Sequence, residues 1–248
     1  MAEIENVERP YPRPLSGAKV GHLPSALVPA RTALVGRYVT LEPLDAARHA
    51  GDLFEASHGN EASLRIWDYL PWGPWKSEAE YKNVLREQTA RQDQVYYAVL
   101  PAAGGKACGQ TSFLDIQPEH GVIEVGSIWF GLTLQRTRSA TESMYLMLRY
   151  AIDDLGYRRM QWRCNALNAA SRAAARRLGF RFEGIFYNHM IFKGRNRDTA
   201  WYSILDDEWP KVREIMEQWL APGNFDEDGI AKTSLAAVMK ERGPSHRV

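Results

Sequence analysis

The sequence predicts an α/β domain in which a mixed, mostly antiparallel central sheet is flanked by helices. Of its 248 residues, 45% are hydrophobic and 25% are charged, a balance typical of a globular chain with a sizeable core. Three runs of strand-forming residues, 95–100, 108–116 and 122–130, are separated only by short turns, which indicates an antiparallel meander. A long amphipathic helix pattern precedes the next strand, 158–165, so the sheet is expected to be mixed.

The chain begins with a segment that lacks a regular apolar pattern. Residues 1–33 contain five prolines and predict an extended arm. Residues 34–220 are expected to form the single domain, and residues 221–248 a tail with one marginal helix. Within the domain, residues 37–42 alternate as a strand, and Asp45 is expected to cap a helix that runs through Phe54.

An aromatic segment, residues 63–75, separates this helix from the next one. Its prolines and glycine exclude a long helix and predict a packed turn. Two interpretations of Trp67, Trp72 and Trp75 stay open, because these side chains could either plug a core or line a substrate pocket. Ser77 then opens a capping box for a helix that ends near residue 90.

The central helix is predicted within residues 134–155. Ser139 and Glu142 have capping-box spacing, which would set its start. One apolar stripe follows at three- and four-residue steps, and Gly156 supplies a left-handed stop. The stripe consists of Met144, Met147, Leu148, Ala151 and Leu155.

The residues in front of this helix suggest an anion site. Gln135, Arg136, Thr137 and Arg138 lie where unpaired backbone N–H groups and the positive end of the helix dipole meet two guanidinium groups. The alternative interpretation is a well-capped core helix whose two arginines are only solvated.

After the strand at 158–165, a short helix is expected at 171–178 and a hairpin at 182–192 and 199–205, with its turn at 193–197. Asp207 is expected to cap a last helix that has Pro210 in its first turn. Its buried face is predicted to contain Trp209, Val212, Ile215, Met216 and Trp219.

The order of strand, basic loop, helix, strand, short helix and Gly-Phe resembles the GNAT N-acetyltransferase superfamily. Within it, the sequence resembles the Rim-type branch that acetylates ribosomal-protein N-termini. The second family motif is kept in Asn168, Ser171 and Gly179-Phe180, followed by Glu183. The resemblance covers roughly residues 34–206 and implies a single GNAT domain that takes acetyl-coenzyme A as acyl donor.

The resemblance also implies a set of binding positions. The family's pyrophosphate loop falls on Gln135, Arg138 and Ala140, and Arg138 stands where the family has glycine. Backbone N–H groups near Trp129 to Leu132 are expected to face the thioester carbonyl. The cofactor-binding residues implied are Trp129, Phe130, Gln135, Arg136, Thr137, Arg138, Ser139, Ala140, Thr141 and Asn168.

Two residues are expected to move protons. Glu124 lies among apolar residues of a strand, where burial would raise its pKa enough for it to act as the base; alternatively, it pairs with an arginine in the sheet. Ser171 matches the serine that gives the departing thiolate its proton in Rim-type enzymes, and it could also be the N-cap or a first-turn residue of the next helix. His189 could face either the acceptor cleft or solvent, and it joins the three tryptophans as a candidate acceptor-binding residue.

The remaining composition limits partners and location. A net charge of +1 gives no general attraction to nucleic acid or anionic membrane. No apolar run is long enough to span a bilayer and residues 1–13 lack a signal-peptide core, so a cytoplasmic protein is expected. Cys108 and Cys164 lack metal-ligand spacing and are expected to be reduced core thiols.

The leading functional hypothesis is therefore an acetyl-coenzyme A-dependent N-acetyltransferase that uses no metal. Its acceptor would be a primary amine, either of a protein N-terminus or of a small molecule. A non-catalytic module that binds or senses acyl-coenzyme A is the main alternative, and an interaction protein that keeps only the fold is another. The oligomeric state stays open, with a dimer as one option.

Overall fold

The computed structural model describes residue 20 and residues 28–243, so most of the predicted N-terminal arm and the last five residues lie outside the described part of the chain. An eight-stranded sheet has the order β1-β2-β3-β4-β5-β6-β8-β7. Its strands are β1 (Leu34–Val35), β2 (Val39–Pro43), β3 (Val95–Pro101), β4 (Gly109–Gln117), β5 (Val122–Phe130), β6 (Arg159–Asn165), β7 (Arg181–Phe192) and β8 (Arg195–Leu205). The helices are α1 (Ala46–His58), α2 (Glu61–Leu64), α3 (Glu78–Ala90), α4 (Arg138–Arg149), α5 (Ala169–Arg177), α6 (Trp209–Leu220) and α7 (Leu235–Glu241).

The predicted mixed, mostly antiparallel sheet is confirmed. Strands β3, β4 and β5 form the expected antiparallel meander, and β5 and β6 pair in parallel. The other neighbouring strands pair antiparallel. The parallel step arises because α4 connects β5 to β6 across one face of the sheet, as a parallel connection requires.

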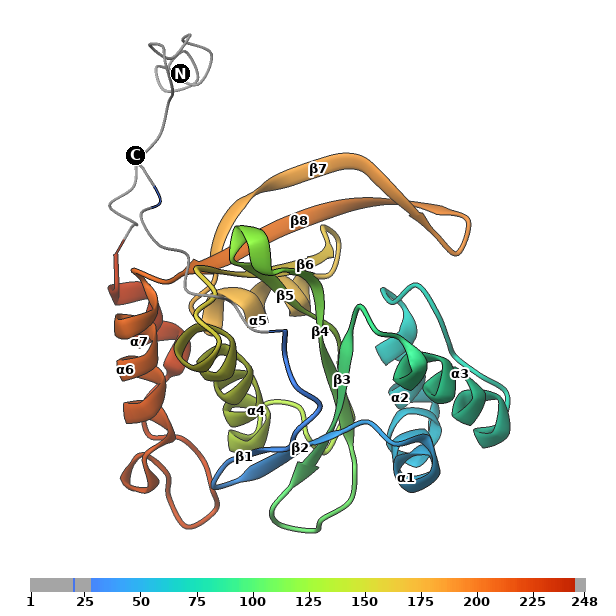
Figure 1. Cartoon of the computed structure of the whole chain (residues 1–248). Coiled ribbons are helices and arrows are strands. Elements are labelled where there is room, and N and C mark those ends of the chain that lie inside the picture. The colour runs from blue at the N-terminus through green and yellow to red at the C-terminus, as the bar shows by residue number, and fades with distance from the viewer. Residues whose placement is uncertain (1–19, 21–27, 244–248) are drawn as a thin grey trace, which may run out of the picture.

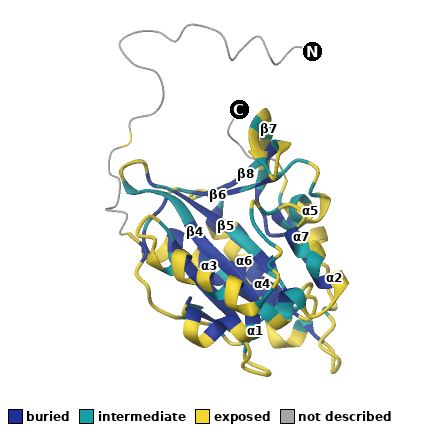
Figure 2. Ribbon diagram, turned by 90° about the vertical axis from the view of Figure 1, so that its right-hand side faces the viewer, coloured by how far each residue is buried: buried dark blue, intermediate teal, exposed yellow. Residues whose placement is uncertain are grey.

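Helices cover both faces of the sheet, as Figure 1 shows: α1, α2 and α3 lie on one side, and α4 and α6 on the other. Each side has its own hydrophobic core. The larger core includes Ile123, Met144 and Met160, and the smaller one includes Leu53, Trp67 and Trp129. The colouring in Figure 2 follows this arrangement, with buried residues along the strands and exposed residues on the outer sides of the helices.

The predicted start of α4 is wrong. Thr137 is the N-cap, and its Oγ1 accepts from the N–H of Ala140 at 3.1 Å. Ser139 instead donates to the carbonyl of Tyr38 at 2.9 Å. The carboxylate of Glu142 accepts from the N–H groups of Arg37 and Tyr38. Ser139 and Glu142 therefore bind the turn between β1 and β2 and do not form a capping box.

The rest of this helix agrees with the sequence. The predicted apolar stripe is buried in the larger core. A π-helical turn, Tyr150–Asp154, continues α4, and Gly156 ends the segment with a φ of 77° in the left-handed region that glycine adopts at no steric cost.

Two predictions near the C-terminal half are also corrected. The N-cap of α6 is Glu208 and not Asp207; the Glu208 carboxylate accepts from the N–H of Leu205 and pairs with Arg181. The hairpin turn is shorter than predicted, because β8 already begins at Arg195 and its first residues pair with the end of β7. The left-handed residues Lys193 and Gly194 form the tip.

The C-terminal segment packs on the domain. Phe225, Leu235 and Met239 are buried in the larger core, and the indole of Trp219 donates to the carbonyl of Thr233. Within the described residues, no helix is long and apolar enough to cross a membrane.

Candidate functional site

The strands β5 and β6 separate halfway along their length. They pair from Val122 with Arg159 to Glu124 with Gln161, and over the described chain β6 supplies no partner for the rest of β5. At Ser127 the backbone of β5 has a φ of 50°, and the register with β4 shifts there. The bulge bends β5 away from β6, which leaves an opening in the sheet with strand backbone along its edge.

The loop before α4 lies at the end of this opening. Arg136 has a φ of 62°, in the left-handed region that residues other than glycine seldom adopt. The side-chain amide of Gln135 donates to the carbonyl of Phe130 at 2.8 Å and joins the loop to the end of β5. Both residues are exposed.

Three N–H groups of this loop have no protein acceptor within the part of the chain that the structure describes. They belong to Arg136, Arg138 and Ser139, whereas the N–H of Ala140 is taken by Thr137. They lie at the N-terminal end of α4, where the helix dipole is positive. Such a group of N–H donors is suited to a phosphate or another anion.

The side chain of Arg138 points away from these donors. Its guanidinium lies 4.4 Å from the ring centroid of Tyr38 and 3.6 Å from that of Phe225. Glycine and arginine both supply a backbone N–H at this position, but arginine adds a side chain whose charge lies against Tyr38 and against Phe225 of the tail. The Arg138 guanidinium is therefore held by aromatic rings rather than by the anion site.

The side chains that follow are also turned inward. Thr141 is 1% exposed and its hydroxyl accepts from Arg177 at 2.9 Å. Ala140 is buried as well. Of the predicted cofactor-binding residues Ser139, Ala140 and Thr141, Ser139 thus offers an open backbone N–H, whereas the N–H groups of Ala140 and Thr141 are taken by Thr137.

Glu124 lies beside the opening, on the sheet face opposite to Ile123 and Val125. It is 4% exposed and forms an ion pair with Arg163 of β6. Burial raises the pKa of Glu124 to about 7, although Arg163 acts in the opposite direction. The predicted pairing with an arginine is thus observed, and the raised pKa is compatible with the predicted role as a base, which stays a prediction.

Space next to the Glu124 carboxyl is kept by a glycine. A Cβ at Gly126 would lie 3.0 Å from Glu124 Oε1 and 2.8 Å from Leu114 Cδ1. Any other residue at this position would press on the carboxyl. The glycine thus lets the Glu124 carboxyl lie close to the backbone of β5.

Ser171 and Asn168 lie on the opposite face of the sheet. Asn168 is the N-cap of α5, and its Oδ1 accepts from the N–H of Ser171 at 3.0 Å. Ser171 is a first-turn residue, and its Oγ accepts from the indole of Trp162 at 3.0 Å. That bond uses a lone pair of Oγ and leaves the hydroxyl proton available to donate.

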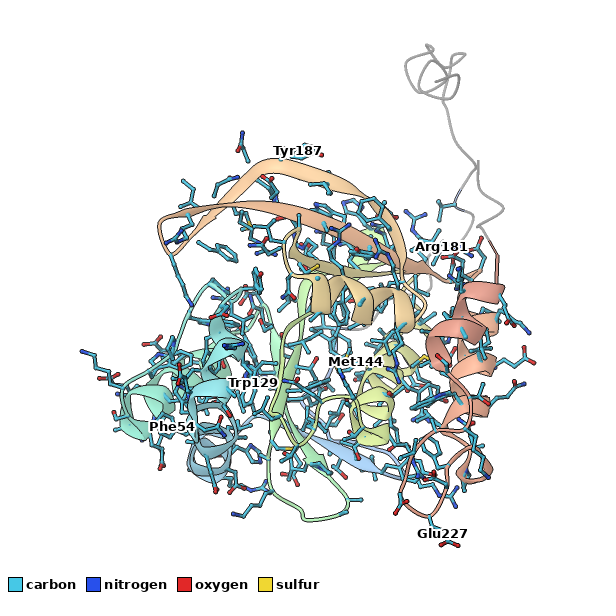
Figure 3. All side chains as sticks on the ribbon, turned by 180° about the vertical axis from the view of Figure 1, so that it is seen from behind. Phe54, Trp129, Met144, Arg181, Tyr187 and Glu227 are labelled. Carbon is cyan, nitrogen blue, oxygen red and sulfur yellow. The ribbon has the colours of Figure 1, made fainter. Side chains whose placement is uncertain are left out.

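The aromatic segment packs mainly as a core. Trp67 is 1% exposed, with its ring centroid 4.9 Å from Trp75 and 5.4 Å from Trp129, and Trp72 lies 6.3 Å from it. Trp129 is therefore held by its side chain in the smaller core, on the side of the strands toward α1, whereas Met144 lies on the side of α4 (Figure 3). Trp72 and Trp75 are partly exposed.

A cavity of about 300 Å³ lies between the middle of this segment, residues 68–70, and the tip of the β7–β8 hairpin. The ammonium group of Lys193 donates to the carbonyl of Trp67 at 2.7 Å, which fixes the tip over the cavity. Residues in its wall include Asp68, Tyr69, Asn165, Lys193, Arg195 and Arg197. Sequence reasoning missed these residues, although the alternation of β6 and β8 could have placed Arg163 and Arg197 on the face opposite to the core.

His189 lies on the hairpin beyond this cavity. Its Nδ1 is 2.9 Å from Thr199 Oγ1, and its ring centroid is 6.0 Å from Trp201, which in turn lies 4.8 Å from the Arg163 guanidinium. His189 thus belongs to the same face as Glu124 but contacts it only through Trp201 and Arg163. Among the described residues, no group of three or more His, Cys, Asp and Glu side chains could hold a metal ion.

Comparison with known proteins gives a consistent result. Residues 39–181 match the family model described as an acetyltransferase (GNAT) domain. A crystal structure of a GCN5-related N-acetyltransferase from Brucella melitensis is 44% identical, covers 85% of this chain and 95% of its own, and has a TM-score of 0.83.

Two further relatives concern the Rim-type branch. The Bacillus subtilis (strain 168) protein named "Putative ribosomal N-acetyltransferase YdaF" is 25% identical over 184 residues, which is 72% of this chain and 97% of that protein. A structure of RimL, described as a ribosomal L7/L12 α-N-protein acetyltransferase in complex with coenzyme A, is 22% identical and covers 71% of this chain and 99% of its own. Its TM-score of 0.59 shows a shared fold.

Proposed function

Since this chain belongs to the GNAT acetyltransferase family, we propose that it acts as a Rim-type enzyme and moves the acetyl group of acetyl-coenzyme A to a primary amine by direct attack on the thioester. The observation that supports this most directly is the group of three N–H donors at the start of α4 that have no acceptor among the described residues, at the end of the opening between β5 and β6. The donors suit the pyrophosphate, and the opening suits the extended arm that joins it to the thioester. Acetyl-coenzyme A is thus the acyl-donor substrate.

In the proposed reaction the amine nitrogen attacks the thioester carbonyl carbon, and the C–S bond then breaks. Backbone N–H groups at the edge of β5 near Trp129 and Phe130 would stabilise the oxyanion that develops on the carbonyl oxygen. Glu124 would take the proton that leaves the nitrogen, because its pKa of about 7 keeps much of it ionised at neutral pH. Ser171, on the opposite face, would give its hydroxyl proton to the departing thiolate.

The energetic cost of preparing the amine favours an α-amine over a lysine. Deprotonating an α-amine of pKa about 7.7–8.0 at neutral pH costs roughly 1 kcal/mol, whereas a lysine at about 10.4 costs close to 5 kcal/mol. A carboxyl whose pKa is near 7 is close in pKa to an α-amine and far from a lysine. We therefore place a protein N-terminus or a small primary amine ahead of a lysine side chain as acceptor.

The alternative of a non-catalytic acyl-coenzyme A sensor was motivated by arginine in place of the family glycine at Arg138. The structure weakens that motivation, because the Arg138 N–H has no protein acceptor among the described residues. Its side chain is stacked on Tyr38 and Phe225 and does not cover the donors. Transfer chemistry thus remains the function that the site supports best.

Arg138 also permits a test of the N–H donors themselves. It is the first residue of α4 and follows an extended Thr137, which is the position where proline is best tolerated. Arg138→Pro removes the side chain and the N–H, whereas Arg138→Ala removes only the side chain. Because a hydrogen bond to a charged group contributes roughly 1.5–3 kcal/mol, we expect the proline variant to bind acetyl-coenzyme A at least tenfold more weakly than the alanine variant in calorimetry.

Both variants should keep the far-UV circular dichroism of the parent protein. Equal affinities of the proline and alanine variants would show that the pyrophosphate lies elsewhere. Release of coenzyme A thiol in the presence of an amine, measured on the parent protein, separates transfer from binding alone.

A further inference from the structure

The charges around the cavity under the hairpin are unequal. Asp68 is its acidic wall residue, whereas Lys193, Arg195 and Arg197 are basic. Lys193 is already engaged, since its ammonium donates to the carbonyl of Trp67 and lies near Asp68. Over the described chain neither Arg195 nor Arg197 forms an ion pair with a carboxylate, although Glu124 acts on Arg197 from a longer distance.

Arg197 is the better placed of the two. Its Nε is buried without an acceptor in the described structure, and Nη1 meets only the sulfur of Met190 at 3.8 Å. The guanidinium lies 4.4 Å from the ring centroid of Phe192, which holds it in the wall. Burial lowers the pKa of Arg197, although the Glu124 carboxylate lies near enough to act in the opposite direction, so the side chain has lost part of its hydration without forming a direct ion pair.

A buried N–H of a charged group is costly when it has no acceptor, and a thioether sulfur is only a weak one. A carboxylate removes that cost efficiently, because its two oxygens match two N–H groups of a guanidinium. The cavity, about 300 Å³ in volume, is at the lower limit for small-ligand pockets. It is therefore suited to one acidic side chain or a small acidic molecule.

The cavity is connected to the proposed reaction site. Arg197 lies on the same strand as Trp201, four residues earlier and hence on the same face. Trp201 stacks on Arg163, and Arg163 pairs with Glu124. An acceptor could thus place its amine at Glu124 and its acidic group at Arg197, on the side of the hairpin tip.

We propose that the cavity under the β7–β8 hairpin binds a carboxylate of the acceptor through Arg197, with Arg195 as a second cation, so that the enzyme selects primary amines that carry an acidic group. This inference rests on the proposed function, because it names the acceptor of that same site. Two sources share this chemistry: an acidic residue that follows the α-amine of a peptide, and a free amino acid with an acidic side chain.

The first test measures binding without turnover. Peptides that lack the N-terminal amine and contain either Glu or the isosteric Gln at the next two positions are titrated into the coenzyme A complex in a calorimeter. The Glu peptide should bind at least tenfold more tightly than the Gln peptide, and added salt should reduce this preference. Free glutamate compared with glutamine forms the second arm and identifies a small-molecule source if it shows the larger preference.

Three variants assign the effect to Arg197. Arg197→Gln should reduce the preference for the Glu peptide to less than about threefold, and Arg197→Lys should restore part of it because the charge returns. Arg86→Gln is the matched control, since Arg86 is an exposed arginine on α3 that lies outside the cavity; it should keep the full preference. Equal binding of Glu and Gln probes by the parent protein, or an undiminished preference in Arg197→Gln, overturns the proposal.

Turnover is measured in parallel with the same peptides carrying a free α-amine. Acetylation that favours the Glu peptide in kcat/KM, and loses that preference in Arg197→Gln, supports the proposal and the transferase activity together. A binding preference that depends on Arg197, with no acetyl transfer to any acceptor, would support the carboxylate-binding site and overturn the proposed function instead.

Discussion

At the scale of single residues, two opposing effects act on the pKa of Glu124. Burial raises its pKa to about 7, and the adjacent Arg163 favours the ionised form. Because the folded-state pKa lies above the ordinary value of a glutamate, the carboxyl is neutral below about pH 7 and able to accept a proton above it.

This leads to a prediction on the pH dependence of catalysis. With an α-amine acceptor, kcat/KM of the parent protein should rise through two ionisations, one near pH 7 from Glu124 and one near 8 from the amine. Glu124→Gln should abolish the lower one and reduce kcat at pH 7 by about 10²–10⁴-fold, the usual contribution of a general base. Stopped-assay rates between pH 5.5 and 9 would measure both, with buffers of constant ionic strength.

Glu183→Gln is the control for that experiment. Glu183 is also a carboxylate bound to an arginine on the sheet, but its hydrogen bonds with Arg159 lower its pKa. Its replacement should leave the pH profile unchanged. A profile of Glu124→Gln that keeps the lower ionisation would make Glu124 a structural partner of Arg163 and nothing more.

At the scale of elements, Glu142 shows how a sequence motif can be used for a different purpose. In α3, Ser77 caps the helix and Glu80 reaches back to the N–H of Lys76, much as its spacing predicts. In α4, the equivalent glutamate is 6% exposed and accepts from two N–H groups of the turn between β1 and β2. The same spacing thus makes a local cap at the surface and a tertiary contact in the interior.

The difference in burial predicts a difference in stability. Glu142→Ala leaves two N–H groups without this acceptor and should lower the free energy of unfolding by about 3–6 kcal/mol, since each such bond to a charged group contributes roughly 1.5–3 kcal/mol. Glu80→Ala, at an exposed cap, should lower it by no more than about 1 kcal/mol. Urea denaturation of both variants would measure the two values, and equal losses would contradict the assignment of Glu142 to the β1–β2 turn.

At the scale of the whole molecule, the C-terminal segment belongs to the folded body. The sulfur of Met239 would lie 3.0 Å from a Cβ at Gly179, which shows how closely α7 packs against the end of α5. Arg242 donates to the carbonyl of Gly179, and Arg181 to that of Gly243. Phe225 of the same segment stacks on Arg138, so the tail also borders the loop that is proposed to bind the donor.

A prediction follows for two neighbouring positions of α7. Met239 is 5% exposed, and Met239→Ala should lower the free energy of unfolding by about 2–5 kcal/mol, as expected for a methionine in a packed core. Lys240→Ala, at an exposed position, should change it by less than about 0.5 kcal/mol. Thermal denaturation of the two variants would be compared with the parent protein, and two unchanged melting temperatures would show that the tail does not contribute to the core.

Patterns local to the chain determined the elements of this protein. Apolar residues at helical spacing predicted the buried stripe of α4, and strand alternation predicted the β3–β4–β5 meander, because which side of an element is apolar depends only on residues a few positions apart. The same patterns, with the family resemblance, selected Glu124 and Ser171 as candidates and the α4 start as an anion site.

Only the tertiary structure decided which partners these residues meet. β8 lies between β6 and β7, and this order brings Arg163 under Trp201 and Arg197 into the wall of the cavity. Glu142 accepts a hydrogen bond from the β1–β2 turn, and Arg138 contacts the rings of Tyr38 and Phe225. Both contacts join residues that are far apart in the sequence. Spacing along a helix or strand fixes the direction of a side chain, but the group that it meets there is set by how distant segments pack, which no local pattern encodes.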